Sequence, residues 1–442
     1  MATISAVLQR IKLDLRVFLP DGMVLEACRH VGHSWRHRHF DPVLTLHLFI
    51  LQVLHFNTAL THLRHLSKLP MTAAAYCKAR MRLPLPALQM LLRQSAAAMR
   101  AATDGKASWQ GLRTWLVDGS STIAPDTPAL DKAFGHSANQ REGCSFPVPK
   151  LLGLFDAFGG LVIEILCLPL VVHEQAHVWK LHPLLGQGDL LIGDRGFCSY
   201  VHLAMLHLRN VHGCFRLHQR KIVSFRAHRK SRCKGQTGKP RSTFIKRLGR
   251  QDQLVRWQKD QQPKWLGLAQ YLTLPETLVV RELRYALAAK GQRTRKVTVV
   301  TTLLDPVLYP KEKIAELYGV RWQVETHFRE LKTTLRMRKL KCKTVEGLQK
   351  ELAVYCLVYN LIHAVMLQAA RRQDVTPDRI SFIDTVRWLI SAEVGEELPA
   401  LLVNPNRPDR HEPRVIKDLQ DTYRKMTKPR AYLRKHPRWA ER

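Results

Sequence analysis

Residues 311–335, KEKIAELYGVRWQVETHFRELKTTL, carry the most regular pattern in this chain of 442 residues. Apolar side chains recur there at steps of three and four and form one stripe, at Leu317, Val320, Val324, Phe328, Leu331 and Leu335. A second stripe beside it contains Tyr318, Arg321, Glu325 and Lys332. This periodicity predicts a helix over residues 310–343 that packs its apolar stripe on a core and presents a carboxylate flanked by cations. Periodicity alone favours the other interpretation of the second stripe, a solvated face of ion pairs.

Upstream of this helix, over about residues 112–217, short apolar runs alternate with turn signals, which predicts a mixed α/β sheet. Two of the predicted strands end in a carboxylate: Asp118 follows Val117, and Asp194 follows the run Leu190–Ile192. The remaining elements are a hairpin over 151–167, helices over 174–186 and 200–209, and a strand over 214–217. Because neighbouring strands can end at one edge of a sheet, we expect Asp118 and Asp194 to meet there, with Glu325 supplied by the helix packed across it.

The first hundred residues are predicted to be helical. Asp41 followed by Pro42 is typical of a helix start. Two short helices, over 58–67 and 72–82, suit a helix-turn-helix unit whose second helix would present basic and aromatic side chains, namely Tyr76, Lys78, Arg80 and Arg82. A plain helical bundle with a basic face explains the same residues. After the patterned helix, an apolar helix over 346–370 is compatible with either a dimer contact or burial in the core.

The charge of the chain points to a polyanionic partner. Lysine and arginine number 70 against 36 acidic residues, so the formal net charge is +34. Such an excess repels itself in the folded protein, and nucleic acid relieves that repulsion. Residues 218–250 contain twelve basic residues and no acid. We therefore predict that a basic β-rich insertion over 218–296 contacts DNA phosphates, the alternative being a solvated loop.

The nine cysteines are scattered without a CxxC pair, which favours reduced thiols in a cytoplasmic protein. The most apolar stretch, residues 43–56, is too short for a membrane span and includes two histidines and a glutamine. The N-terminus is interrupted by charges where a signal peptide would be apolar. We therefore expect no membrane partner and a location in the cytoplasm, associated with the nucleoid.

The motif Tyr318-x2-Arg321-x3-Glu325-x6-Lys332 resembles the YREK signature of DDE transposases from bacterial insertion sequences of family four. The segments WLVDGSS, around Asp118, and LLIGDRGF, around Asp194, are similar to the first and second aspartate motifs of that family. The resemblance covers residues 112–217 and 297–343. It implies a ribonuclease H-like fold with an insertion before the last catalytic helix.

The resemblance also implies roles for these residues. Asp118, Asp194 and Glu325 would be the catalytic acids and would ligate two Mg²⁺ ions, for which Mn²⁺ would substitute. The chemistry agrees, because two ions about 3.5–4 Å apart activate the attacking oxygen and stabilise the leaving oxygen of a phosphodiester, and Mg²⁺ prefers carboxylate oxygens. By the same resemblance, Tyr318, Arg321 and Lys332 would contact DNA phosphates. A tryptophan of the insertion, Trp257 or Trp265, would either stack on a flipped base or simply pack.

Together these patterns predict a transposase that binds the terminal inverted repeats of its element, pairs them as a homodimer, cuts, and joins the ends to target DNA. The expected parts are a helical end-binding domain (residues 1–107), the first part of the catalytic domain (108–217) and the insertion (218–296). The second part of the catalytic domain (297–343) and a C-terminal helical region with a basic tail (344–442) follow. Alternatives are a host nuclease or recombinase of the same fold, or a transposase-derived repressor.

Two other motifs compete for a catalytic role. Asp156 also ends an apolar strand, although its place before the turn at Gly159 and Gly160 favours a role in the hairpin. His173, Glu174 and His177 match the HExxH pattern of zinc proteases. A protease would explain neither the charge nor the patterned helix, and 21 histidines make chance matches common.

Overall fold

The computed structural model of the chain describes residues 18–36, 40–101, 108–137, 144–218, 221–225, 232–233, 242–287, 295–391 and 428–436. About half of the basic run of residues 218–250, and most of the basic tail after residue 404, lie outside these ranges. The prediction that the basic run contacts DNA therefore stays a prediction for those residues.

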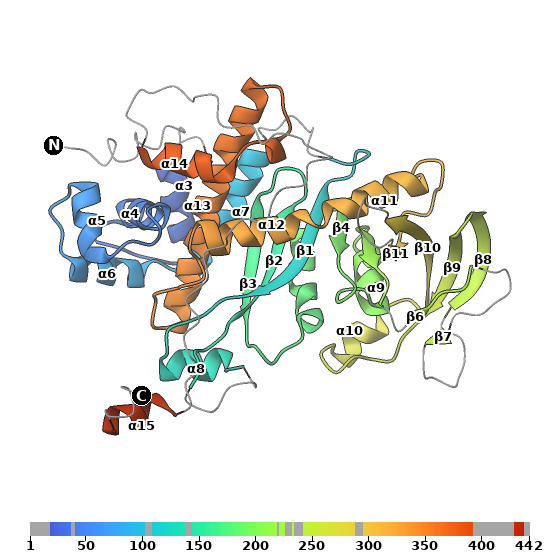
Figure 1. Cartoon of the computed structure of the whole chain (residues 1–442), viewed down its shortest axis with the longest axis horizontal. Coiled ribbons are helices and arrows are strands. Elements are labelled where there is room, and N and C mark those ends of the chain that lie inside the picture. The colour runs from blue at the N-terminus through green and yellow to red at the C-terminus, as the bar shows by residue number, and fades with distance from the viewer. Residues whose placement is uncertain are drawn as a thin grey trace, which may run out of the picture.

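A nine-stranded sheet forms the centre of the molecule, with the strand order β3-β2-β1-β4-β5-β11-β10-β9-β8 (Figure 1). The strands are β1 Thr114–Ser121, β2 Lys150–Asp156, β3 Val162–Leu168, β4 Leu190–Gly193, β5 His212–Arg216, β8 Ser242–Gly249, β9 Asp252–Gln258, β10 Thr277–Leu287 and β11 Arg295–Thr301. Strands β1, β2 and β3 are antiparallel neighbours, whereas β1, β4 and β5 are parallel. This arrangement confirms the predicted mixed, ribonuclease H-like sheet.

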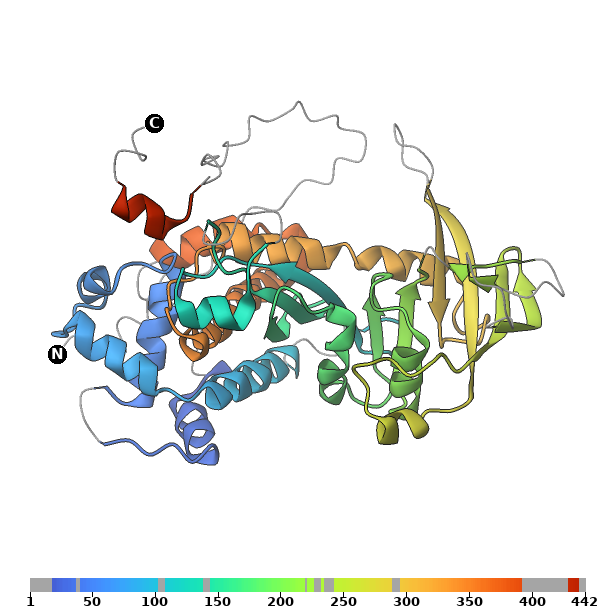
Figure 2. The same cartoon turned by 90° about the horizontal axis from the view of Figure 1, so that it is seen from below.

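Alternation along β1 divides the core into two layers, because successive side chains of a strand point to opposite faces. Trp115 and Val117 pack with the helix α9, Tyr200–Leu208. Leu116 packs on the other face, with the core formed by the helices α11, α12 and α13. Figure 2 shows these two helical layers, green and orange, on opposite sides of the sheet. Asp118, two residues after Leu116, is therefore on the face that carries the patterned helix.

The patterned helix is shorter and less regular than predicted. It consists of α11, Lys311–Val320, α12, Gln323–Arg329, and one π-helical turn, η3, Glu330–Thr334. The predicted helix to residue 343 is wrong, because Arg336 takes a left-handed conformation, with φ +60°, and the chain then turns into a buried connection. There Met337 is buried and its carbonyl accepts a hydrogen bond from the Thr122 hydroxyl at 3.1 Å.

The helices of the N-terminal part lie at the end of the molecule opposite the outer strands β8 and β9 (Figure 1). They are α3 Asp21–His30, α4 Pro42–Leu54, α5 Leu60–Ser67, α6 Ala73–Arg82 and α7 Leu85–Ala101. The Asp41 carboxylate caps α4 by accepting from the Leu44 amide at 2.7 Å, as the sequence predicted.

Two of the four side chains that α6 was expected to present to DNA point inward instead. Tyr76 is fully buried, and the Arg80 guanidinium lies 3.8 Å above the Phe49 ring and donates to Gln52. Lys78 and Arg82 are exposed. The helix pair α5–α6 therefore packs as part of a bundle, with a smaller basic surface than the helix-turn-helix interpretation assumed.

The long helix α13, Val345–Arg372, is apolar enough to cross a membrane, but 89% of its most apolar 18-residue window is buried in the protein. It packs against α4, α7 and β3. The side chains considered for a dimer contact, Leu352, Leu357, Leu361 and Met366, all lie in this core. Burial within one chain therefore explains this helix, and its apolar face is not available to a second copy.

The remaining described elements connect these layers. They are α8 Pro128–Phe134, η1 Glu174–Ala176, η2 Val178–Leu184, β6 Lys221–Ile222, β7 Arg232–Cys233, α10 Leu268–Leu272, η4 Pro377–Arg379, α14 Phe382–Ser391 and α15 Arg430–Lys435. The α-helix predicted over residues 174–186 is wrong, because this segment forms the two short 3₁₀ helices η1 and η2. Pro183 inside η2 lacks the amide hydrogen that a regular helix would use there.

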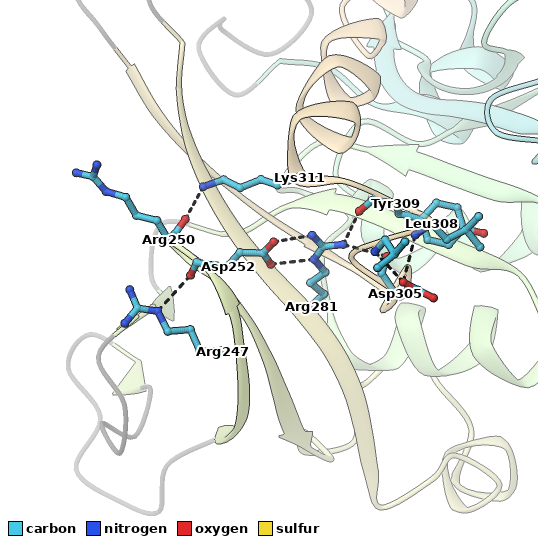
Figure 3. Close-up of polar contacts among 10 residues, drawn as sticks. Arg247, Arg250, Asp252, Arg281, Asp305, Leu308, Tyr309 and Lys311 are labelled. Atoms are coloured by element: carbon cyan, nitrogen blue, oxygen red, sulfur yellow. Dashed lines mark hydrogen bonds and ion pairs between the residues drawn. The ribbon is translucent and has the colours of Figure 1, made fainter.

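The insertion continues the catalytic sheet instead of forming a separate one. Strand β11 pairs antiparallel with β5, and β10, β9 and β8 follow outward. A buried ion pair joins this outer part to the start of α11 (Figure 3). The Arg281 guanidinium donates to the Asp252 carboxylate at 2.8 and 2.5 Å and to the Tyr309 carbonyl at 2.6 Å. Lys311, the first residue of α11, donates to the Arg250 carbonyl at 2.7 Å, so the start of α11 contacts the insertion.

Candidate active site

The register of the parallel strands β1 and β4 places two carboxylates side by side. Val117 of β1 is paired with Gly193 of β4, so the next residues in each chain segment, Asp118 and Asp194, are neighbours. Strand β4 ends at Gly193, as predicted. Strand β1 continues to Ser121, so Asp118 lies within a strand and not at its end. The pairing of these two parallel strands thus places both acids on the face of the sheet on which α11 and α12 lie.

Glu325 reaches this face because the helix tightens just before it. The amides of Arg321, Trp322 and Val324 bond to carbonyls three residues earlier, as in a 3₁₀ turn. The tightening separates α11 from α12. Glu325 follows in the first turn of α12, with its side chain 53% exposed.

The Arg321 guanidinium lies between two of the acids. Its terminal nitrogens are 3.6 Å from Asp118 Oδ2 and 3.4 Å from Glu325 Oε1. The Tyr318 hydroxyl donates to Asp194 Oδ1 at 3.5 Å. Both Tyr318 and Arg321 are buried, at 4% and 5% exposure. The structure therefore brings five of the six predicted residues together, with Tyr318 and Arg321 in contact with the acids.

Burial changes the ionisation of the Asp118 carboxyl. Burial raises its pKa to about 6, and the nearby Asp194 and Glu325 carboxylates also act to raise it. The Gly119 amide, which donates to Asp118 Oδ1 at 2.8 Å, and Arg321 act in the opposite direction. Three acids and one guanidinium in this group leave an excess of negative charge.

This donor set fits divalent cations. All three candidate ligands are carboxylates, which hard cations prefer.

The raised pKa of Asp118 predicts a pH dependence of metal binding. Folding raises this pKa from about 3.8 to about 6, so in the metal-free protein the stability that this group contributes is largest at low pH and is lost as the pH rises through 6. A metal needs the ionised form, so protons compete with it below pH 6. We expect Mn²⁺ affinity to fall by about tenfold per pH unit below that point. Electron paramagnetic resonance of free Mn²⁺ between pH 5 and 7.5 measures this.

The matched variant for this measurement is Asp118→Asn, which carries no titrating group at this position. Its residual Mn²⁺ affinity should lack the step near pH 6. A step of the same size in both proteins would show that a different group titrates.

A cleft of about 240 Å³ opens beside the triad and is rich in cations. It is lined by Asp118, Gly119, Ser120, Glu325, Phe328, Arg329, Lys332, Thr333 and Arg338. Lys332 donates to the Ser120 hydroxyl at 3.0 Å. Arg329 and Arg338 are exposed. This combination of acids and flanking cations suits a phosphodiester, whose charge the cations can neutralise.

The sequence analysis missed Arg329, Arg338 and Trp322. Arg329 follows Glu325 by four residues and so lies on the same helix face, which the sequence spacing alone could have indicated. Arg338 reaches the cleft only because the helix ends early. Trp322 is 51% exposed, and the Arg321 guanidinium lies 4.4 Å from its ring centre.

The competing motifs are explained by structure. Asp156 is fully buried, accepts from the Phe158 amide at 3.3 Å, and lies 3.7 Å from Arg100, which fits the role in the hairpin. In the HExxH segment, His173 has an extended backbone, so His173 and His177 are not one α-helical turn apart. The metalloprotease interpretation is therefore wrong.

The two tryptophans of the insertion both have partners within the protein. Trp257 is buried and its indole donates to Glu282 at 3.0 Å. Trp265 stacks on the His202 ring, with 5.1 Å between ring centres. For Trp257, packing accounts for the side chain.

Comparison with known proteins adds independent information. The family model for the transposase DDE domain matches residues 109–361. The transposase InsG of the insertion sequence element IS4 from Escherichia coli (strain K12) is 24% identical over 366 residues, covering 78% of this chain and 76% of that protein. Among solved structures, the piggyBac transposase synaptic complex with hairpin DNA aligns with 88% of this chain and 80% of that chain, at 9% identity and a TM-score of 0.44.

The match to the family model spans more than half of the chain and includes β1, β4 and α12, the elements that carry Asp118, Asp194 and Glu325. DDE transposases act on DNA with divalent metal ions. The chain belongs to the DDE transposase family and is of the type represented by the IS4 transposase.

Proposed function

We propose that this protein catalyses cut-and-paste transposition with Asp118, Asp194 and Glu325 as its catalytic acids. The observation that supports it most is the β1–β4 register, which sets Asp118 beside Asp194 on the face crossed by α12. A family resemblance identifies motifs, but this pairing is a tertiary contact that the motifs alone do not require. The three acids are the ligands that we assign to two Mg²⁺ ions, with Mn²⁺ as a substitute.

Bound ions would activate the attacking hydroxyl and neutralise charge on the cleaved phosphodiester. The chain's own residues prepare the site for this reaction. Arg321 holds Asp118 and Glu325 near each other while they repel, and Tyr318 restrains Asp194 through its hydroxyl. Lys332, Arg329 and Arg338 border the cleft and supply positive charge for the phosphates on either side of the cut.

The substrate that we propose is double-stranded DNA: first the terminal inverted repeats of the element, and then the target. Two ends must be processed together, so we infer that two copies of the chain form a homodimer in the synaptic complex. Because the family acts on DNA, we place the reaction in the cytoplasm, at the nucleoid. The net charge of +34 supports an extended contact with DNA beyond the cleft.

The test is cleavage of linear DNA that carries the end of the element, with purified full-length protein and Mg²⁺ or Mn²⁺. We expect strand cuts at the element boundary, joining of the released 3′ ends to a target plasmid, and no reaction in EDTA. Tight binding of the end without cutting under any metal condition would instead favour a repressor. Cutting of any DNA without preference for the boundary would favour a nuclease.

The cleft cations give a prediction about binding. Lys332→Gln removes one positive charge from the cleft, and we expect the slope of log K against log salt to become shallower by about 1. The weakening should be similar for end DNA and unrelated DNA, because phosphate contacts do not read sequence. Fluorescence anisotropy at several salt concentrations measures the slope.

Lys313→Gln is the matched control, because Lys313 is an exposed lysine of α11 that pairs with Glu316 at 2.9 Å, outside the cleft. It should leave the slope unchanged. Equal slopes for the wild type and Lys332→Gln would remove Lys332 from the DNA contact.

A further inference from the structure

A second group of potential metal ligands lies behind the catalytic helix. His327 belongs to α12, Glu330 begins the π-helical turn η3, and His363 belongs to α13. One ligand atom from each lies within 4.8 Å of the others, and among the described residues this is the trio of histidine, cysteine and acidic side chains that meets this spacing. His327 and His363 are buried, at 7% and 5% exposure, and the Glu330 side chain is 15% exposed.

In this group two imidazole nitrogens make no hydrogen bond with the described residues. The Tyr359 hydroxyl is 2.8 Å from His327 Nδ1 and donates to Glu330 Oε2 at 3.0 Å. Because that hydroxyl proton goes to Glu330, His327 Nδ1 is the donor in its bond with Tyr359, and His327 Nε2 keeps its lone pair. Within the described part of the chain, His327 Nε2 and His363 Nε2 are buried and have no hydrogen-bond partner. Two orphaned imidazole nitrogens in a buried site are costly unless something binds them.

The charge of Glu330 also calls for a cation. The Glu330 side chain is 15% exposed, and its Oε2 accepts a hydrogen bond from the Tyr359 hydroxyl at 3.0 Å. The ion pairs of Glu330 among the described residues are with His327 and His363, at 3.9 and 3.6 Å, and not with a lysine or arginine. A buried carboxylate without a permanent positive charge beside it is unfavourable.

We propose that His327, Glu330 and His363 form a site for one Zn²⁺ ion, with water as its fourth ligand. Two imidazole nitrogens and one carboxylate oxygen are a ligand set that zinc accepts. In a tetrahedral site with bonds of about 2.0–2.1 Å, ligand atoms lie about 3.3 Å apart. The separation of 3.6 Å between His363 Nε2 and Glu330 Oε2 needs only a small contraction. Tyr359 orients the carboxylate from outside the ligand set, as such partners commonly do.

The turn of the β2–β3 hairpin closes this site. A Cβ on Gly160 would lie 2.7 Å from His363 Nδ1 and 3.2 Å from His327 Cε1, so the backbone approaches both rings. Gly160 also has a φ of +69°, which disfavours any other residue there. The hairpin, α12 and α13 therefore meet at the proposed ion.

The consequence for the reaction is positional. His327 follows Glu325 by two residues, and Glu330 precedes Lys332 by two residues, so both ends of the catalytic segment are next to a proposed ligand. The Glu325 side chain is 53% exposed and turned to Arg321, whereas His327 is buried against Tyr359. An ion bound by His327, Glu330 and His363 would link residues 325–332 to α13. It would thereby restrain the position of Glu325 relative to the sheet.

The experiment measures zinc in full-length protein whose catalytic acids have been replaced, Asp118→Asn with Asp194→Asn, so that the triad does not compete. The protein is purified without a polyhistidine tag, dialysed against EDTA, loaded with Zn²⁺ and dialysed again. We expect one zinc per chain by mass spectrometry, an increase in Tm of several degrees over the EDTA-treated form, and tetrahedral visible bands when Co²⁺ is used instead.

Adding His363→Asn or Glu330→Gln should reduce the retained zinc to background and abolish both the Tm increase and the Co²⁺ bands. The matched control is His182→Asn, a buried histidine outside the cluster whose ring nitrogens also lack partners among the described residues. It should keep one zinc. Glu330→Gln keeps the shape of the side chain, so it still tests the site if His363→Asn does not fold.

Failure of the parent protein to retain zinc would overturn the proposal, as would unchanged zinc in folded Glu330→Gln. Because the measurement uses a chain that lacks two of the catalytic acids, its result does not depend on transposition. A negative result would therefore leave the proposed DNA chemistry in place, and an inactive transposase could still bind zinc.

Discussion

We expect Asp118→Asn, Asp194→Asn and Glu325→Gln each to reduce cleavage of end DNA by at least about 10³-fold, while the affinity for that DNA stays close to that of the wild type. The amides keep the shape of the side chains but remove the charge that holds divalent cations. Groups that act as one unit are strongly non-additive, so we expect the double and triple variants to be little slower than the worst single variant. Single-turnover cleavage with radiolabelled ends measures the rates, and gel shift measures the affinity.

The matched control is Asp156→Asn, the rival carboxylate that the structure places in the hairpin with Arg100. It should lower stability without a specific loss of the cleavage rate in the folded fraction. Cleavage that survives any one of the three triad changes would remove that residue from the active site. Cleavage lost in Asp156→Asn, with its stability intact, would move the site toward the hairpin.

The buried ion pair between Asp252 and Arg281 gives the second large effect. Both side chains are nearly inaccessible, at 5% and 1% exposure, and Arg281 also donates to the Tyr309 carbonyl. Asp252→Ala leaves the guanidinium without its counter-charge, so we expect the free energy of unfolding to fall by about 3–5 kcal/mol. Denaturant titration followed by circular dichroism measures this change.

Two comparisons separate this ion pair from general damage to the insertion. Arg284→Ala, on the same strand, loses a bond to the Thr298 hydroxyl and should lower the free energy of unfolding by only about 1 kcal/mol. Replacing the pair together, as Asp252→Leu with Arg281→Met, should recover part of the loss because no buried charge is left unpaired. Equal stability of Asp252→Ala and the wild type would show that water reaches the guanidinium.

The same pair connects stability to the reaction, because Tyr309 directly precedes the N-terminal end of α11 (Figure 3). Loss of the pair frees the start of the helix that carries Tyr318 and Arg321. At temperatures where Asp252→Ala stays folded, we therefore attribute any slower cleavage to displaced helix residues and not to lost metal ligands.

Much of the site followed from local patterns. The apolar stripe of α11 and α12 is buried as the three-and-four spacing predicted, apart from the half-buried Val320. The strand before Asp194 ends where the run of apolar residues ends. The cap at Asp41 was readable because it depends on neighbours within one turn. Such features could be predicted because the residues that cause them are adjacent in the chain.

The sequence by itself thus determined which acids, cations and strands are present and in what order, since periodicity and strand-end carboxylates are properties of short segments. Only the tertiary structure decided that Arg321 lies between Asp118 and Glu325, that the helix stops at Leu335, and that the insertion extends the catalytic sheet. It also brought His363 to Glu330 from 33 positions farther along the chain. The reason is physical: these contacts join segments far apart in sequence, and packing selects among local conformations of nearly equal energy.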